Sequence, residues 1–306
     1  MLSLLSRTKS FRDPWVGHPV LNRRWQLHRR RLLLAEALRR WRRGLRPETT
    51  PVDEAVLRLR RDGYVVLENV LPAVDFEALR EEAETAVATA ALRHPLPHNQ
   101  REGFLPKQPF SGGFDRFDGG TLNRFLSLDG PGFPRAQQFC HDQRLSALCR
   151  EVIGLPMNPR KLELYLTRHG EESETPDLQK DLHRDTFFRA IKFWFFLRPV
   201  APDDGPFEYV PGSHRLTRSR LSWEQAKANA AILHRRPPDS SGSFRIQEQD
   251  LAALDLPAPV SLACDANTLV LADVFGFHRR GAARPGRERL ALYGWNRPYP
   301  FLPLSW

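Results

Sequence analysis

Apolar and polar positions alternate in several short segments of the second half of the chain. The segment 161–169 (KLELYLTRH) has leucine at every second position, with polar or aromatic residues between the leucines. Similar short segments, separated by turn-forming residues, are AIKFWFFLRPV, FEYVPGS, VSLACDANTLVLADVFGFHR and RLALYGWNRP. Residues two apart on an extended chain share a face, so this pattern predicts strands with one face in a core. Many short strands with regular turns predict an antiparallel sandwich or barrel.

The first half of the chain carries helical patterns instead. Thr50 and Pro51 predict the capped start of a helix that ends at Gly63, and the following YVVLENVL predicts a strand. The segments AVDFEALREEAETAVATAALR and RLSALCREVIG predict two more helices. Residues 95–135 are rich in Gly, Pro, Phe and Asp and lack a clear period, which predicts a long ordered loop over a site. Helices leading into antiparallel strands predict an α+β fold.

A basic amphipathic helix is predicted near the N-terminus. Its apolar positions, with arginines between them, are Leu27, Leu34, Leu38, Trp41 and Leu45. Residues 1–46 hold thirteen Lys or Arg against two acidic residues, so the net charge of +10 belongs to this part of the chain. Such a helix either contacts an anionic membrane surface or nucleic acid, or packs on the main domain with a solvated arginine face. We expect packing, and we predict a basic arm over residues 1–50 and one large domain over 51–306.

Composition limits the class of protein. A chain of 306 residues with 41% apolar content can bury a sizeable core. No stretch approaches the roughly 20 apolar residues that cross a bilayer, and the apolar start is too short for a secretory signal. The three cysteines have no metal-binding or redox spacing, which argues against a disulfide scaffold and for a reducing compartment. We therefore expect a soluble cytoplasmic protein.

The pattern H-x-D at His183 and Asp185 precedes the strand AIKFWFFLRPV. On an extended segment these two side chains point the same way and offer two ligands to one metal ion. His278 follows a later apolar strand, at a place where a barrel brings distant strand ends to one mouth. Two histidines and one carboxylate form the facial triad of non-haem Fe(II) oxygenases, which leaves coordination positions for a chelating cosubstrate and dioxygen.

A keto acid such as 2-oxoglutarate chelates iron at one end and leaves a carboxylate at the other end. That carboxylate needs a fork-shaped cation, which arginine supplies. The candidates near the end of the chain are Arg280, Arg284, Arg287 and Arg289. We predict Arg289, eleven residues after His278, because it starts the last strand beside small Ala291. The Pro-Gly turn before it places Arg284 and Arg287 on a solvated loop.

Together these segments resemble the phytanoyl-CoA dioxygenase-like family of Fe(II)/2-oxoglutarate-dependent oxygenases. The resemblance runs from about residue 53 to 300 and rests on LRRDGYVVLENVL, LHRDTF, GPFEYVPGSH and FHRRGAARPGRERLALY. It implies a double-stranded β-helix (jelly-roll) core with helices packed around it. It also implies the site residues: His183, Asp185 and His278 for iron, and for 2-oxoglutarate Arg289, with Trp194, Thr167 and Tyr165 lining its pocket.

The expected reaction is hydroxylation of a small organic or acyl substrate, with decarboxylation of 2-oxoglutarate to succinate. The family does not fix the substrate, because function is grafted onto a shared fold. Arg279 and Arg280 depart from the small or polar residues that often follow the distal histidine in the family, so the substrate side stays open. The alternative is a non-catalytic jelly-roll ligand-binding protein that its basic arm recruits to an anionic surface. Under either hypothesis we expect no specific nucleic-acid partner, and peripheral membrane contact only through the arm.

Overall fold

Two antiparallel sheets face each other and enclose the predicted site residues. The computed structural model describes residues 5–44, 53–96, 105–129, 132–158, 161–171 and 175–302. Its helices are α1 (Pro19–Trp25), α2 (Leu27–Gly44), α3 (Glu54–Asp62), α4 (Ala73–Arg93), α5 (Pro134–Cys140), α6 (Gln143–Ile153) and α7 (Arg218–His234). The strands are β1 (Tyr64–Leu67), β2 (Leu105–Phe110), β3 (Gly113–Asp118), β4 (Thr121–Ser127), β5 (Leu162–His169), β6 (Ile191–Phe196), β7 (Phe207–Tyr209), β8 (Val260–Ser261), β9 (Thr268–Asp273), β10 (His278–Arg280) and β11 (Glu288–Asn296).

The larger sheet has the strand order β1-β9-β6-β11-β5-β4-β3-β2, and the smaller sheet has the order β10-β7-β8. Alternating residues of the central strands lie on opposite faces of the sheet, one in the apolar core and one toward the smaller sheet, as the sequence predicts. The leucines of β5 join the apolar core on the outer face, whereas Tyr165 faces inward and packs in a cluster with Trp194 and with Phe207 of the smaller sheet. The α+β jelly-roll arrangement predicted from the sequence is therefore confirmed.

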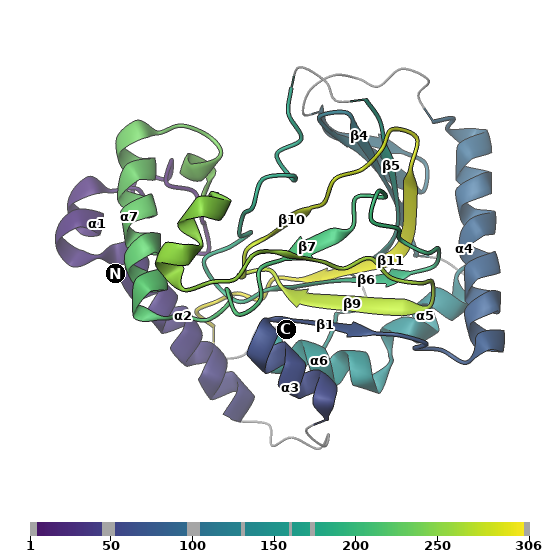
Figure 1. Cartoon of the computed structure of the whole chain (residues 1–306), viewed down its shortest axis with the longest axis horizontal. Coiled ribbons are helices and arrows are strands. Elements are labelled where there is room, and N and C mark those ends of the chain that lie inside the picture. Colours follow the sequence, from purple (N-terminus) through teal and green to yellow (C-terminus); the bar gives the residue numbers. More distant parts are fainter. Residues whose placement is uncertain are drawn as a thin grey trace.

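Helices cover the outer face of the large sheet. Apolar side chains of α3, α4, α5 and α6 share one core with the outward residues of β5, β6, β9 and β11. Figure 1 shows α3, α5 and α6 along one side of the sheet and α4 at its far end. The start of α3 corrects the predicted cap, because Asp53 accepts a hydrogen bond from the Val56 N–H at 3.0 Å and the helix begins at Glu54. Thr50 and Pro51 lie outside the described residues.

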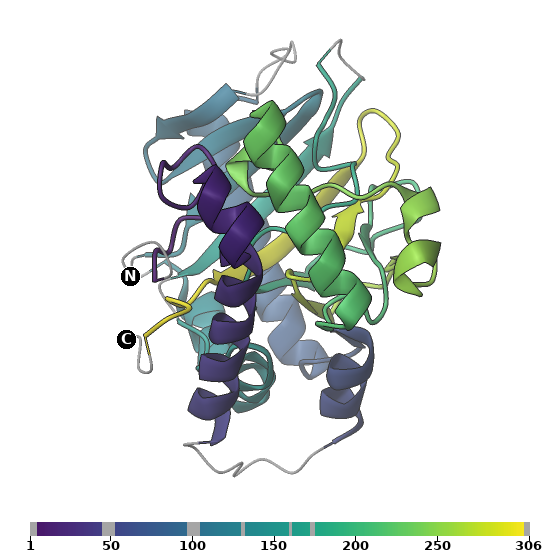
Figure 2. The same ribbon diagram turned by 90° about the vertical axis from the view of Figure 1, so that its left-hand side faces the viewer.

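The N-terminal arm packs onto the rest of the molecule. Helices α1 and α2 both contact α7, and Figure 2 shows α1 and α2 running alongside it. Leu32 and Ala35 of α2 join an apolar cluster with Phe187 and Phe275. The expectation of a packed arm is met, while the proposed membrane contact of the arm stays a prediction. None of the helices in the described part of the chain is long and apolar enough to cross a membrane.

The buried face of α2 differs from the predicted stripe. Trp41 is half exposed, whereas Arg31 is fully buried and donates to the carbonyl oxygens of Ser6 and Thr8, both at 2.6 Å. Arg39 is likewise buried and donates to Glu36 at 2.8 and 2.9 Å. The helix therefore turns part of its arginine face inward, because carboxylates and carbonyl oxygens are placed to accept from it. Leu45 lies outside the described residues.

The predicted loop over residues 95–135 is wrong for most of its described part, because β2, β3 and β4 form two successive hairpins there. The apolar pattern misleads because β4 buries charged and polar side chains. Arg124 is 1% exposed and donates to Asp115 of β3 through two hydrogen bonds of 2.8 Å. A paired arginine and aspartate fill positions that periodicity reserves for apolar residues.

Helix α7 is absent from the sequence-based prediction for the same reason. Its buried face includes Arg220 and Glu224. The Glu224 carboxylate is fully buried and accepts from His28 of α2 at 2.9 Å, from Arg184 at 2.7 and 2.8 Å, and from Arg220 at 3.1 and 3.2 Å. Burial alone would raise the pKa of Glu224, but Arg184 and His28 hold that pKa well below its usual range. One charged side chain thus joins the arm, α7 and the H-x-D segment.

We predict that Glu224→Gln destabilises the protein strongly. The amide keeps the shape but leaves Arg184 and Arg220 as unmatched buried charges, so the free energy of unfolding should fall by about 3–5 kcal/mol. Urea denaturation followed by circular dichroism measures the change. The control is Glu81→Gln on an exposed position of α4, which should change stability by no more than about 0.5 kcal/mol. Equal stability of the two variants would contradict the central role of Glu224.

Candidate metal centre and adjoining cavity

The structure brings His183, Asp185 and His278 together. One ligand atom from each lies within 4.8 Å of the other two, and all three residues are buried. The backbones of His183 and His278 pair directly, with N–H to O distances of 3.0 and 2.9 Å in the two directions. The Asp185 N–H donates to the Val274 carbonyl oxygen at 3.0 Å. Residues 95 positions apart are therefore neighbours because β10 extends into a pairing with the H-x-D segment.

Each histidine presents its Nε2 to the shared centre. The Nδ1 of His183 lies 2.7 Å from the Asp181 carbonyl oxygen, and the Nδ1 of His278 lies 2.9 Å from the Gly276 carbonyl oxygen. A carbonyl only accepts, so each Nδ1 carries the proton and each Nε2 keeps its lone pair. Burial, and then the neighbouring His278, lower the pKa of His183 to about 4. The Nε2 of His278 is buried without a hydrogen-bond partner among the described residues, as expected for an atom that binds a metal ion.

The two oxygen atoms of the Asp185 carboxylate have different neighbours. Its Oδ1 lies 3.5 Å from the Nε2 of His183 and 3.6 Å from the Nε2 of His278. Its Oδ2 accepts from Lys192 at 2.7 Å and from Arg297 at 2.9 Å. Burial alone would raise the pKa of Asp185, but Lys192 and Arg297 hold that pKa well below its usual range. The carboxylate is therefore ionised, with Oδ1 directed toward the histidines. Two imidazoles and a carboxylate fit a divalent ion such as Fe(II).

Arg289 lines the same cavity as the three ligands His183, Asp185 and His278, and the volume of this cavity is about 260 Å³. It is 7% exposed, and it has no ion pair or hydrogen bond among the described residues. It pairs directly with Thr167 on β5, and no described residue forms a hydrogen bond with the buried Thr167 Oγ1. Burial is the main cause that lowers the pKa of Arg289 to about 10, which leaves it charged at neutral pH. A buried unpaired guanidinium is costly, so the cavity beside Arg289 suits a carboxylate.

Aromatic side chains line the cavity that Arg289 and the two histidines also line. Trp194 and Tyr165, both expected in the cosubstrate pocket, line the cavity together with Phe125 and Tyr293. Phe125 stacks on Tyr165 at a centroid distance of 4.4 Å, and Trp194 lies 5.7 Å from Tyr293. Thr167 is not among the residues that line the cavity, although it pairs with Arg289 across β5 and β11. The cavity lining thus includes Trp194, Tyr165 and Arg289, while a role for Thr167 stays a prediction.

The two arginines whose role the sequence analysis left open, Arg279 and Arg280, both line the cavity and both pair with carboxylates. Arg280 is buried, forms a hydrogen-bonded ion pair with Asp177, and donates to Asn123 at 2.8 Å. Asn123 also accepts from the Tyr165 hydroxyl. Arg279 lines the cavity and pairs with Glu208 and Glu248. Two consecutive arginines after His278 indicated polar residues near the site. Their carboxylate partners could not be identified from the sequence, because these lie in distant segments.

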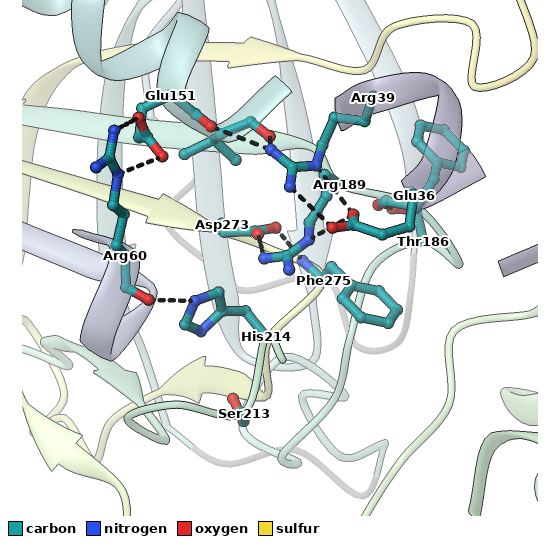
Figure 3. Close-up of polar contacts among 12 residues, drawn as sticks. Glu36, Arg39, Arg60, Glu151, Thr186, Arg189, Ser213, His214, Asp273 and Phe275 are labelled. Atoms are coloured by element: carbon teal, nitrogen blue, oxygen red, sulfur yellow. Dashed lines mark hydrogen bonds and ion pairs between the residues drawn. The ribbon is translucent and has the colours of Figure 1, made fainter. Parts of the chain in front are cut away.

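A second polar network fixes the chain just after the H-x-D pair. Arg189 pairs with Asp273 at the end of β9, and its Nε lies 3.4 Å from Glu36 of α2 (Figure 3). Glu36 in turn accepts from Arg39, whose guanidinium also donates to the Glu151 carbonyl oxygen at 3.3 Å. The network connects the arm, helix α6 and the segment that leads from Asp185 into β6.

Comparison with known proteins gives a family match. The profile of the family "Phytanoyl-CoA dioxygenase (PhyH)" matches residues 59–247, which is more than half of the chain. The matched region includes His183 and Asp185, while His278 and Arg289 follow it. A curated relative, "Dioxygenase cdmD" of Talaromyces verruculosus, is 20% identical over 180 residues, which cover 54% of this chain and 57% of that protein. The chain thus spans little more than half the length of this relative.

Solved structures with a similar course of the chain have low sequence identity. AviO1 from Streptomyces viridochromogenes Tue57 is 19% identical, with 82% of this chain and 97% of that chain covered and a TM-score of 0.48. HygX from Streptomyces hygroscopicus, solved with nickel and 2-oxoglutarate bound, is 17% identical, with 81% and 87% covered and a TM-score of 0.43.

We predict that the purified protein binds one divalent ion per chain and that His278→Ala weakens this binding by more than about 100-fold. A missing ligand should cost more than the 10–100-fold typical of residues that only support a ligand. Calorimetric titration with Co(II) measures the affinity, and circular dichroism confirms the fold. His141→Ala, which removes an exposed histidine, is the control and should bind like the unmodified protein. Unchanged affinity in His278→Ala would remove His278 from the metal centre.

Proposed function

We propose, from the premise that the chain belongs to the phytanoyl-CoA dioxygenase family, that it is an Fe(II)- and 2-oxoglutarate-dependent dioxygenase that hydroxylates a small organic or acyl substrate. The observation that carries the proposal is that one cavity is lined by two buried side chains with nitrogen atoms that lack a hydrogen-bond partner among the described residues. Among the described residues, the buried Nε2 of His278 and the buried Nε of Arg289 have no hydrogen-bond partner, and both side chains line this cavity. A metal ion satisfies the first, and the distal carboxylate of 2-oxoglutarate satisfies the second.

His183, Asp185 and His278 would hold the iron through two Nε2 atoms and the Oδ1 atom. Bound Fe(II), with 2-oxoglutarate and dioxygen, supplies an oxidative decarboxylation that yields succinate and carbon dioxide and places one oxygen atom in a C–H bond of the substrate. Lys192 and Arg297 hold Oδ2 of Asp185, which leaves Oδ1 for the metal. The two carbonyl oxygens that accept from the Nδ1 atoms keep both imidazoles in the required tautomer and orientation.

The cosubstrate would lie between these residues and Arg289. The guanidinium offers a planar fork to the distal carboxylate, and the Thr167 hydroxyl beside it supplies one more donor. Trp194, Tyr165 and Phe125 exclude water from this path, which strengthens the ion pair with Arg289.

The alternative of a non-catalytic jelly roll is less well supported. Reuse of the fold for binding alone commonly removes a metal ligand, yet the three side chains here stand within reach of one ion. That alternative needs the basic arm for recruitment to an anionic surface. Three arginines of the arm instead form hydrogen bonds inside the protein: Arg31, Arg39 and Arg42.

The direct test is release of succinate. Metal-free protein is loaded anaerobically with Fe(II) and 2-oxoglutarate, mixed with air-saturated buffer, and succinate is measured by mass spectrometry with and without a pool of candidate metabolites. We expect succinate only when iron and 2-oxoglutarate are both present, and Asp185→Ala should lower it by at least about 100-fold. Iron-independent succinate, or none with any metabolite pool, would contradict the proposal.

A paired substitution tests the arginine assignment. Arg289→Lys keeps the charge but loses the fork, so the 2-oxoglutarate concentration for half-saturation should rise roughly tenfold or more. Arg287→Lys is the matched control, because Arg287 is half exposed and pairs with Asp204 outside the cavity. Equilibrium binding of 2-oxoglutarate to the Co(II)-loaded protein measures both. A larger effect at Arg287 than at Arg289 would reverse the assignment.

A further inference from the structure

The N-terminal strap, defined here as residues 5–12, contributes one side chain, Lys9, to the lining of the cavity. The Nζ of Lys9 lies 2.7 Å from the Asp185 carbonyl oxygen. Lys9 has no carboxylate partner among the described residues. The sequence resemblance begins near residue 53, so family reasoning gave no reason to expect a cavity residue at position 9.

The strap is held in place from several directions. Arg31 of α2 donates to two of its carbonyl oxygens, at Ser6 and Thr8. The Phe11 N–H donates to the Ser240 carbonyl oxygen at 2.9 Å, and the Tyr299 hydroxyl donates to the Leu5 carbonyl oxygen at 2.8 Å.

The 239–242 turn lets the strap approach closely. Gly242 has a φ of +82°, and a Cβ at this position would collide with the Lys9 carbonyl oxygen. Glycine is therefore required there both for its backbone conformation and for space. A segment fixed at this many points presents its lysine in one place.

The cavity is strongly cationic. Seven of the described side chains that line it are Lys or Arg, and Asp185 is the carboxylate among them. Three of the arginines pair with carboxylates outside the cavity lining: Arg116 with Asp118, Arg279 with Glu208, and Arg280 with Asp177. Arg289 is assigned above to the distal carboxylate of the cosubstrate. Lys9, Lys192 and Arg297 remain, and all three contact Asp185.

One carboxylate cannot balance these three cations once the site is loaded. The two charges of a bound divalent ion are matched by Asp185 and by the chelating carboxylate of 2-oxoglutarate. The described lining of the cavity then offers no further negative charge to Lys9, Lys192 and Arg297. Like charges at short range in a partly buried site repel each other, and each keeps its desolvation cost unless an anion accepts from it.

We propose that Lys9, Lys192 and Arg297 form a subsite for an anionic group of the substrate, a carboxylate or a phosphate, beside the metal centre. The inference rests on the proposed function and narrows its substrate class from any small organic molecule to a negatively charged one. It also gives the N-terminal strap a direct part in substrate recognition. Lys9 is the sharpest test residue, because Lys192 and Arg297 also hold the Asp185 carboxylate.

The test uses three small probes of similar size: acetate, methylphosphonate, and acetamide as the neutral counterpart of acetate. The full-length protein is loaded with Zn(II) and saturating 2-oxoglutarate, which occupy the metal centre and Arg289. Saturation transfer from protein to the probe's methyl protons, followed over a concentration series, gives the apparent Kd of each probe.

At least one anion should bind the unmodified protein, and Lys9→Met should raise its apparent Kd by about tenfold or more, since a charged hydrogen bond is lost. Lys9→Arg should retain most of the binding. Tighter binding of methylphosphonate assigns the subsite to a phosphate-type group, and tighter binding of acetate assigns it to a carboxylate. Lys161→Met removes the same charge from a lysine outside the cavity, which contacts Trp295, and should leave both anions unaffected.

Equal anion affinity in the unmodified protein and Lys9→Met, or acetamide bound as well as acetate, would overturn the subsite. Loading with Zn(II) and 2-oxoglutarate is measured separately by calorimetry on the same samples. Failure of loading counts against the proposed function, and the probe titration is then run on the metal-free protein, where the same dependence on Lys9 decides the subsite. The two failures are therefore distinguishable.

Discussion

The buried ion pair between Arg184 and Glu224 is the interaction on which the site depends most. Arg184 stands between His183 and Asp185, and alternation along an extended chain sends its side chain to the opposite side from theirs. There it meets Glu224 of α7, which is fully buried and also accepts from His28 and Arg220. The pair thus anchors the H-x-D segment from behind. A charge pair with no solvent on either partner tolerates little displacement, because any loss of alignment leaves an uncompensated charge.

The outer face of the large sheet forms the apolar core, and its inner face carries residues of the cavity. Leucine and phenylalanine on the outer face of β5, β6 and β11 pack against helices, and this packing makes the strand positions rigid. The inner face of the same strands carries Tyr165, Trp194 and Arg289, which therefore take their positions from a core that they do not join. Alternation with a period of two residues makes this division possible, since neighbouring residues serve different faces.

Basic residues of the N-terminal arm act inside the molecule as well as on its surface. Arg31 holds the strap that carries Lys9, and Glu36 with Arg39 links α2 to the chain that follows Asp185. The arm and the sheets are thus connected by charged contacts that converge on the metal centre. A boundary at residue 50 separates the basic part of the chain from the rest. The cavity crosses this boundary, because Lys9 of the arm lines it.

The sequence by itself determined the parts of the protein that depend on local pattern. Alternation predicted β5, and short strand-like segments between turns predicted β6, β9 and β11. A period of two residues also placed Arg289, Ala291 and Tyr293 on one face, in agreement with the structure. H-x-D, the distal His278 and the arginine eleven residues later gave the candidate centre, because ligand chemistry needs particular residue types. Only the tertiary structure decided β2–β4, α7 and the cationic lining of the cavity. In each of these a charged residue is buried or half-buried beside a partner from another element or segment: Arg124 beside Asp115, Glu224 beside Arg184, and Lys9 beside Asp185. Hydrophobic periodicity has no signal for such a residue, because its burial is stabilised by a contact that exists only after the chain has folded.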